Sequence, residues 1–282
     1  MDHHIVYHSI RPWRALMAGM AFAALCVTAP LTWAQAPPVP LLRAHAHNDY
    51  VHDRPLLDAL DHGFCSVEAD IYLVDGQLLV AHDLKDVRPE RTLQALYLEP
   101  LRERTAANRG SVYPNGPRFL LLIDFKSEGV ETYAELKPIL ERYKDMLTTF
   151  SPKATEEKAV TLILSGNSPR EIVAAEATRF VGIDGRLTDL QFPLNPHLTP
   201  LISDVWKGNF NWFGSGPMPE DVKQRLEHIV STAHAAGCIV RFWGIPPRED
   251  LWEALYNSGV DLINADNLEQ LQQFLLAKEK MQ

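Results

Sequence analysis

Eight short apolar segments, separated by longer amphipathic stretches, constrain the fold more than any other feature of this sequence. Each segment has the length of a buried β-strand, and most are followed by residues with helical periodicity. The segments are residues 41–47, 66–74, 118–126, 159–166, 179–185, 200–206, 238–244 and 260–266. Eight strands alternating with helices over about 245 residues match one (β/α)8 barrel. We therefore expect residues 41–282 to form a single TIM-barrel domain.

The stretches between these segments carry helix boundary signals, with proline at the start and glycine just past the end. Four helices are predicted, over residues 54–63, 131–147, 219–237 and 247–259. Residues 77–82 follow an Asp75-Gly76 turn and are predicted to form a hairpin with the second strand. A doubly wound open sheet is the alternative fold, but no glycine-rich phosphate loop follows the first strand.

The first residues have the features of an export signal. Two arginines precede an apolar run over residues 15–29, and Ala34–Ala36 has the small-x-small form of a cleavage site. We predict that residues 1–36 are removed, that residues 37–40 form a linker, and that the protein is periplasmic or secreted. An uncleaved membrane anchor is the alternative, although Pro30 ends the run before the roughly 18 apolar residues that a membrane span requires.

Charge and cysteine content exclude some classes of function. The chain has 36 acidic and 27 basic residues, a net charge of -9, so a basic surface for nucleic acid is not expected. An anionic substrate would need local positive charge. Beyond the signal only Cys65 and Cys238 remain, too few for a disulfide scaffold or a cysteine-rich zinc site.

Ionisable residues gather where the predicted strands end, which is where TIM barrels carry their chemistry. The pairs inside a strand are two residues apart, so both members lie on one face. A barrel interior is normally apolar, and charges facing it need partners. The residues are His45 and His47 on the first strand, Glu68 and Asp70 on the second, His82 beyond the hairpin, Asp124 and Lys126 on the third, and Arg241 and Trp243 on the seventh.

Glu68 and Asp70 are the strongest indication of a metal site. Two carboxylates on one face of a buried strand repel each other unless a cation lies between them, and Asp124 on the next strand can add a third. Oxygen ligands of this kind suit Mg²⁺ or Ca²⁺. The alternative is that both residues face solvent on an alternating edge strand.

Lys126 and the histidines leave more than one interpretation open. Lys126 reaches the same end of the barrel and could neutralise a phosphate or an oxyanion, or be a solvated surface lysine. His82 ends an apolar run before Asp83, where a structural role is also common. His45 and His47 could form a metal clamp or contribute one member of an acid–base pair.

Six motifs, taken in order, resemble one enzyme superfamily. The chain resembles the glycerophosphodiester phosphodiesterase branch of the phosphatidylinositol-phospholipase-C-like phosphodiesterases, and most of all the altered inheritance of mitochondria protein 6-like group. The resemblance spans residues 45 to 266, nearly the whole mature chain. The motifs are HAHNDY, VEAD, VAHD, LLIDFK, RFWG and GVDLINAD.

The resemblance implies a divalent-cation-dependent phosphodiesterase that acts on a small-molecule or lipid phosphodiester. It implies an acid–base pair, a cation site for Mg²⁺ or Ca²⁺, a lysine that contacts the phosphate, and residues that line the substrate pocket. The acid–base pair is His45 with His82, and the cation site is Glu68, Asp70 and Asp124. The lysine is Lys126, and the residues lining the substrate pocket are His47, Asn48, Arg241 and Trp243. No nucleic acid and no stable membrane span after signal cleavage are expected.

Departures from the family pattern leave the substrate open. Ala46 stands where glycerophosphodiesterases usually carry arginine, and Asp124 where that branch often has glutamate. His45 and Asn48 reproduce the His-x-x-Asn opening of sphingomyelinase-D-like relatives, so a phospholipid head group is a second possibility. Whether His45 or His47 is the catalytic histidine of the first strand stays open.

Two other classes of function remain as alternatives. Zinc-dependent amidohydrolases also begin with His-x-His, but their sites need further histidines on the fifth and sixth strands, which this chain lacks. A barrel that binds lipid or polyol without catalysis is the other alternative.

Overall fold

The computed structural model describes residues 1–3 and 37–280. Eight parallel strands close into a barrel, because the first strand pairs with both the second and the last. They are β1 (Leu41–Ala46), β2 (Phe64–Val74), β4 (Phe119–Phe125), β7 (Val160–Gly166), β8 (Val181–Gly185), β9 (Leu201–Val205), β10 (Ile239–Trp243) and β11 (Leu262–Ala265). Each corresponds to one predicted segment, so the TIM barrel is confirmed. Except for its first three residues, the predicted export signal lies outside the described residues.

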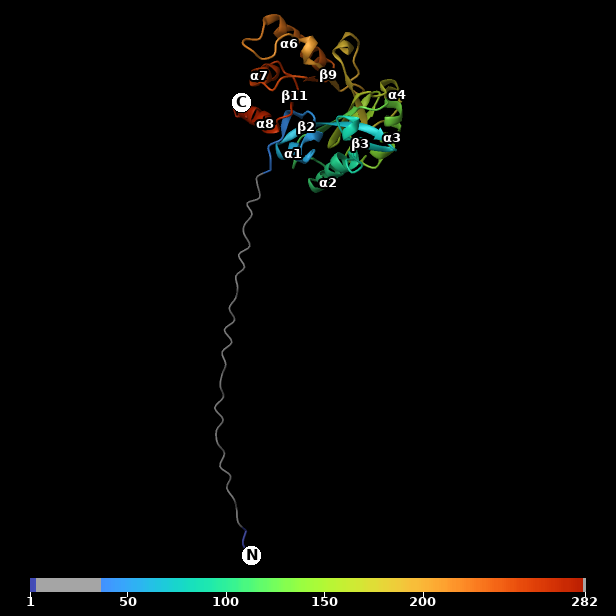
Figure 1. The fold of residues 1–282 in the computed structure, drawn as a ribbon, viewed down its shortest axis with the longest axis vertical. Coiled ribbons are helices and arrows are strands. Elements are labelled where there is room, and N and C mark those ends of the chain that lie inside the picture. Colours follow the sequence, from blue (N-terminus) through green and yellow to red (C-terminus); the bar gives the residue numbers. More distant parts are fainter. Residues whose placement is uncertain (4–36, 281–282) are drawn as a thin grey trace. The chain divides into compact units, whose positions relative to one another are not determined.

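Helices surround the barrel (Figure 1). They are α1 (Leu57–Asp61), α2 (Glu99–Ala107), α3 (Gly129–Glu141), α4 (Arg170–Ala175), α5 (Trp206–Asn209), α6 (Glu220–Ala235), α7 (Glu249–Asn257) and α8 (Leu268–Glu279), with short helical segments η1 (Asp49–Val51), η2 (Leu84–Asp86), η3 (Gln94–Leu98) and η4 (Leu187–Gln191). The four predicted helices are confirmed as α1, α3, α6 and α7, although α3 ends at Glu141, soon after Pro138. In the described part of the chain, no helix has the length and apolar character needed to cross a membrane.

A hairpin extends the second strand beyond the barrel, as predicted. β3 (Gln77–Val80) pairs antiparallel with β2 across a turn in which Asp75 and Gly76 both have positive φ angles, 49° and 73°. The chain leaving β3 runs back along β2, with the Ala81 amide donating to the Asp70 carbonyl at 3.2 Å. A second hairpin, formed by β5 (Thr149–Ser151) and β6 (Ala154–Glu156), was not predicted.

The barrel interior changes from apolar to polar along the strands. A layer of four side chains crosses the barrel, and each is at most 5% exposed; we call it the floor: Leu122, Ile163, Leu201 and Leu262. Two residues further along each of these strands stands a polar residue: Asp124, Ser165, Ser203 and Asn264. The carboxyl ends of the strands therefore form a polar mouth above an apolar floor.

Candidate active site

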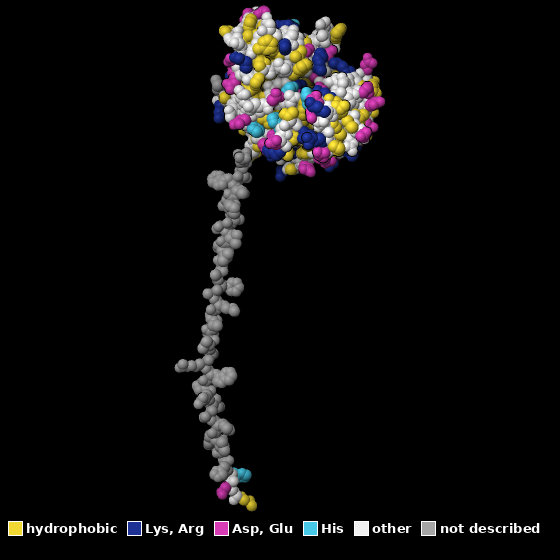
Figure 2. Space-filling view, in the orientation of Figure 1, with side chains coloured by type: hydrophobic (Ala, Val, Ile, Leu, Met, Phe, Trp, Pro, Cys, Tyr) yellow, Lys and Arg dark blue, Asp and Glu magenta, His cyan; other side chains and the backbone are white. Residues whose placement is uncertain are grey.

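Strand register brings the acidic residues together at the mouth. Asp70 on β2 is the register partner of Asp124 on β4, and Asp124 is the partner of Ser165 on β7. Residues in register on parallel strands point to the same side, so these three form a row, with Glu68 two residues deeper. Figure 2 shows one face of the molecule on which histidine side chains lie among acidic and basic ones.

Lys126 is paired with two of these carboxylates. Its Nζ lies 3.0 Å from Asp70 Oδ2 and 2.9 Å from Asp124 Oδ1. Burial raises the pKa of Asp70, and the charge of Glu68 adds to this effect, whereas Lys126 opposes it. Burial alone would lower the pKa of Lys126, but its bonds to the two aspartates raise it above the ordinary value. Lys126 is therefore a cation at the centre of the acidic row.

Glu68 is paired with a buried arginine. Arg241 is 2% exposed; its Nη2 lies 3.2 Å from Glu68 Oε2 and its Nε donates to Asn264 Oδ1 at 2.8 Å. Burial alone would raise the pKa of Glu68, but Arg241 and the nearby histidines bring it below the ordinary value. Arg241 thus lies beneath the mouth, while Trp243, at the end of β10, is half-buried.

The two histidines of the first strand occupy different depths. His45 is fully buried, with Nδ1 2.7 Å from Ser66 Oγ, and burial followed by the charge of Arg241 lowers its pKa to about 3. His47 reaches the mouth, with its side chain 28% exposed. Its Nδ1 lies 2.8 Å from Asp266 Oδ1, and this bond lowers the pKa of Asp266. At neutral pH, His45 is therefore an uncharged residue below the site.

His82 is held in the same way as His47. Its side chain is 62% exposed, and Nδ1 lies 3.1 Å from Asp70 Oδ2 and 3.0 Å from the Tyr50 hydroxyl. Tyr50 also lies 2.8 Å from Asp70 Oδ2 and 2.6 Å from Asn48 Oδ1. Because a carboxylate can only accept, it favours the proton of each ring on Nδ1. The Asn48 amide, whose Nδ2 lies 2.9 Å from His47 Nδ1, can donate to Asp266 Oδ1 at 3.3 Å instead. Nε2 of His47 and of His82 is then the nitrogen that can exchange a proton with a substrate.

The carboxylates at the mouth have the chemistry of a divalent-cation site. Among the described residues, no three acidic, histidine or cysteine side chains converge closely enough to hold a metal ion. Each of the three carboxylates makes its ion pairs through a single oxygen. Glu68 uses Oε2, Asp70 uses Oδ2 and Asp124 uses Oδ1. The second oxygen of each carboxylate belongs to the donor type that Mg²⁺ and Ca²⁺ prefer. The carboxylates therefore have the donor chemistry for such a cation, whereas in this structure the Lys126 ammonium lies between Asp70 and Asp124.

Some residues that shape the site were not singled out from the sequence. Tyr50 stands within the HAHNDY motif, which already indicated its position. The sequence indicates Asp266, at the end of GVDLINAD, only as a last-strand aspartate of the zinc-dependent alternative. Opposite β1 in the strand order, a second polar cluster surrounds Asp184. Its Oδ2 accepts from Ser165 and Ser203 hydroxyls and from Arg186, at 2.7 to 2.8 Å. Burial raises the pKa of Asp184.

Comparison with known proteins agrees with this architecture. The model of the AIM6-like phosphodiesterase domain matches residues 35–184, which include Lys126 and the three carboxylates. Altered inheritance of mitochondria protein 6 from Eremothecium gossypii is 32% identical over 274 residues, covering 84% of this chain and 70% of that protein. The Saccharomyces cerevisiae (strain S288c) protein is 31% identical over 273 residues, covering 79% and 68%.

A solved structure supports the fold at lower sequence similarity. The glycerophosphodiester phosphodiesterase from Parabacteroides distasonis superposes with a TM-score of 0.51 and 16% identity, covering 86% of this chain and 99% of that one. At this identity the likeness concerns the barrel alone. The sequence matches are long enough and similar enough to show the family as well as the fold. The chain belongs to the AIM6-like phosphodiesterase domain family.

Proposed function

We propose that this protein is a divalent-cation-dependent phosphodiesterase in which His47 and His82 act as the acid–base pair. One observation carries the proposal: the two rings exposed at the mouth both have Nδ1 on a carboxylate, beside a row of acids and a lysine. His45, the expected partner of His82, is fully buried and uncharged, so we assign the first-strand role to His47 instead. His45 then supports the site from below.

The residues of the mouth supply complementary parts of the reaction. A phosphodiester resists attack because its oxygens are anionic, and a cation held by Glu68, Asp70 and Asp124 would offset that charge. Lys126 binds a phosphate oxygen from the same place. One imidazole Nε2 takes a proton from the attacking hydroxyl or water, and the other gives a proton to the leaving alkoxide.

The carboxylates behind the rings favour this proton transfer. When Nε2 gains a proton the imidazolium carries positive charge, which Asp266 stabilises for His47 and Asp70 stabilises for His82. Arg241 pairs with Glu68 and is itself held by Asn264, so we assign Arg241 to the support of Glu68 rather than to substrate contact. Asn48, bonded to Tyr50, and the half-buried Trp243 remain candidates for substrate contact.

The zinc alternative requires further histidines on the fifth and sixth barrel strands, and β8 and β9 carry none. Nε2 of His45 and Nε2 of His47 both face Glu68 Oε2, at 3.9 and 3.7 Å. We further propose a small-molecule or lipid phosphodiester as the substrate. Export to the periplasm or the medium is also part of the proposal and rests on the leader sequence.

Hydrolysis of bis-(p-nitrophenyl) phosphate and of glycerophosphocholine tests the proposal. We expect turnover with added Mg²⁺ or Ca²⁺ and loss of turnover with EDTA. His47→Ala and His82→Ala should each lower kcat by about 10²- to 10⁴-fold, whereas His228→Ala on the exposed face of α6 should not change it. Turnover that persists in EDTA, or a fully active His82→Ala enzyme, would contradict the mechanism. No hydrolysis under any condition would favour the non-catalytic barrel.

A further inference from the structure

We propose that the amino-terminal end of the barrel carries a second site, which binds a long-chain carboxylate separately from the reaction at the mouth. The observation behind it is a cavity of about 820 Å³. Its walls include Leu120 and Thr161, which lie four residues before Asp124 and Ser165 on the same strands. The cavity therefore opens at the end of the barrel opposite the mouth.

The size and lining of the cavity fit an apolar ligand. Sites for small molecules usually measure about 300–1,000 Å³ and combine apolar walls with a few polar groups. A TIM-barrel interior is normally filled by three layers of side chains, but at the level of Leu120 and Ile239 this interior stays hollow, and both residues are only partly buried. Because the cavity is open to solvent and has apolar side chains in its walls, a hydrocarbon chain there would remove apolar surface from water.

The floor separates this cavity from the active site. Ile163 and Leu262 belong to both the floor and the cavity lining, and the four floor residues are at most 5% exposed. A molecule in the cavity is thus divided from the mouth by a packed apolar layer. The ligand of the second site is therefore not the substrate of the same barrel.

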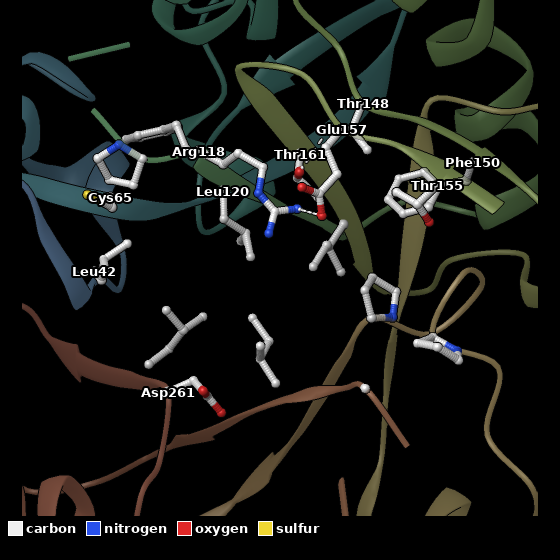
Figure 3. A pocket seen from close by; sticks show the side chains of 18 of the residues that line it. Leu42, Cys65, Arg118, Leu120, Thr148, Phe150, Thr155, Glu157, Thr161 and Asp261 are labelled. Atoms are coloured by element: carbon white, nitrogen blue, oxygen red, sulfur yellow. Dashed lines mark hydrogen bonds and ion pairs between the residues drawn. The ribbon is translucent and has the colours of Figure 1, made fainter. Parts of the chain in front are cut away.

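An ion pair at the cavity wall supplies the position for a carboxylate head group. Arg118 directly precedes β4, and its Nη1 lies 2.5 Å from Glu157 Oε1 (Figure 3). Both side chains are more than half exposed, at 52% and 55%. Such exposed ion pairs contribute only about 0–1 kcal/mol to the stability of the fold. A ligand carboxylate can therefore replace Glu157 as the partner of the Arg118 guanidinium. The hydrocarbon chain then extends towards Leu120 and Ile239.

Fluorescence titration of the full chain with 11-(dansylamino)undecanoic acid, followed by displacement with dodecanoate, tests this proposal. We expect saturable binding that neither EDTA nor His82→Ala alters. Leu120→Trp should block the inner part of the cavity beside Leu120 and weaken binding at least tenfold, while its melting temperature and phosphodiesterase turnover show that the barrel is intact. Loss of binding on His82→Ala would place the probe at the mouth and overturn the proposal.

Substitutions at the ion pair give opposite expectations and do not require a change inside the barrel. Arg118→Gln should weaken dodecanoate about tenfold, because a charge-assisted hydrogen bond is lost, but leave dodecanol unaffected. Glu157→Gln should tighten dodecanoate by up to about fivefold, because the competing carboxylate is gone. Arg88→Gln, an exposed arginine outside the cavity lining, is the matched control. Absence of saturable binding, or equal affinity in both variants, would refute the second site.

Discussion

Replacing Arg241 by methionine tests whether the buried pair with Glu68 stabilises the barrel. Glu68 and Arg241 are 7% and 2% exposed, and methionine keeps part of the aliphatic volume while it removes the charge. Burial, the largest of the influences that lower the pKa of His45, remains in the variant, so His45 compensates at most in part. A buried charge that loses its partner costs about 3–5 kcal/mol. We expect a loss of this size in the free energy of unfolding at pH 7.5.

The loss should depend on pH in a defined direction. Arg241 holds the pKa of Glu68 below its ordinary value, so the ionised carboxylate stabilises the wild-type fold above about pH 4.5 and loses this effect as the pH falls. In Arg241→Met burial, the largest influence, raises the pKa of Glu68, and only the nearby histidines still oppose it. Ionisation then destabilises the variant as the pH rises. The difference between the two proteins should therefore shrink at pH 4.5.

Urea denaturation followed by tryptophan fluorescence, in EDTA and at both pH values, measures this difference. Arg88→Met, at an exposed arginine, should change stability by less than about 0.5 kcal/mol. Adding Glu68→Gln to Arg241→Met should recover part of the loss, because no charge is left unpaired. A loss below about 1 kcal/mol at pH 7.5, or equal losses at the two pH values, would refute the reasoning.

Two further substitutions test electrostatics and backbone geometry. Burial raises the pKa of Asp49 to about 7, so the folded state favours its neutral form and stability should fall as the pH rises from about 4 to 7. Asp49→Asn should remove this dependence, giving a melting temperature above wild type at pH 8; a lower one at pH 8 would argue against it. Gly166 has φ +63°, and an added Cβ would meet Asp124 Oδ1 at 2.6 Å and Phe125 O at 2.5 Å. Gly166→Ala should therefore cost more than Gly76→Ala, where φ is +73° but nothing lies nearby, by about 1–3 kcal/mol in thermal unfolding; equal costs would exclude the steric account.

The sequence predicted the strands and the mouth because both depend on local pattern. Alternating residues fix which side chains share a face, and a barrel collects strand ends at one rim. Depth is different: period two puts His45 and His47 on one face, but the stagger of neighbouring strands decides which of them reaches the rim. The bond between His47 and Asp266 joins residues 219 positions apart and exists only after the barrel closes.

Two helices illustrate another limit of local pattern. α2 buries only Leu101 and Thr105, one turn apart, so its sequence lacks an apolar face that would have predicted it. α8 begins at Leu268 and is capped by Asn267, whose side chain accepts from the Gln270 amide, soon after the last strand ends. Tertiary packing against the barrel, rather than local periodicity, decides that α2 is a helix.

The hairpin that carries His82 allows the distance between His82 and His47 to change. His47 follows β1, which is paired on both sides within the closed barrel, whereas His82 follows β3, which lies at the edge of the sheet, with β2 on one side and an isolated bridge from Leu79 to Thr92 on the other. A change in the Asp75-Gly76 turn can thus shift one of the two proposed proton-transfer groups relative to the other without repacking the barrel. Under the proposed function, we expect relatives with the same barrel to accommodate phosphodiesters of different width by altering this single peripheral turn.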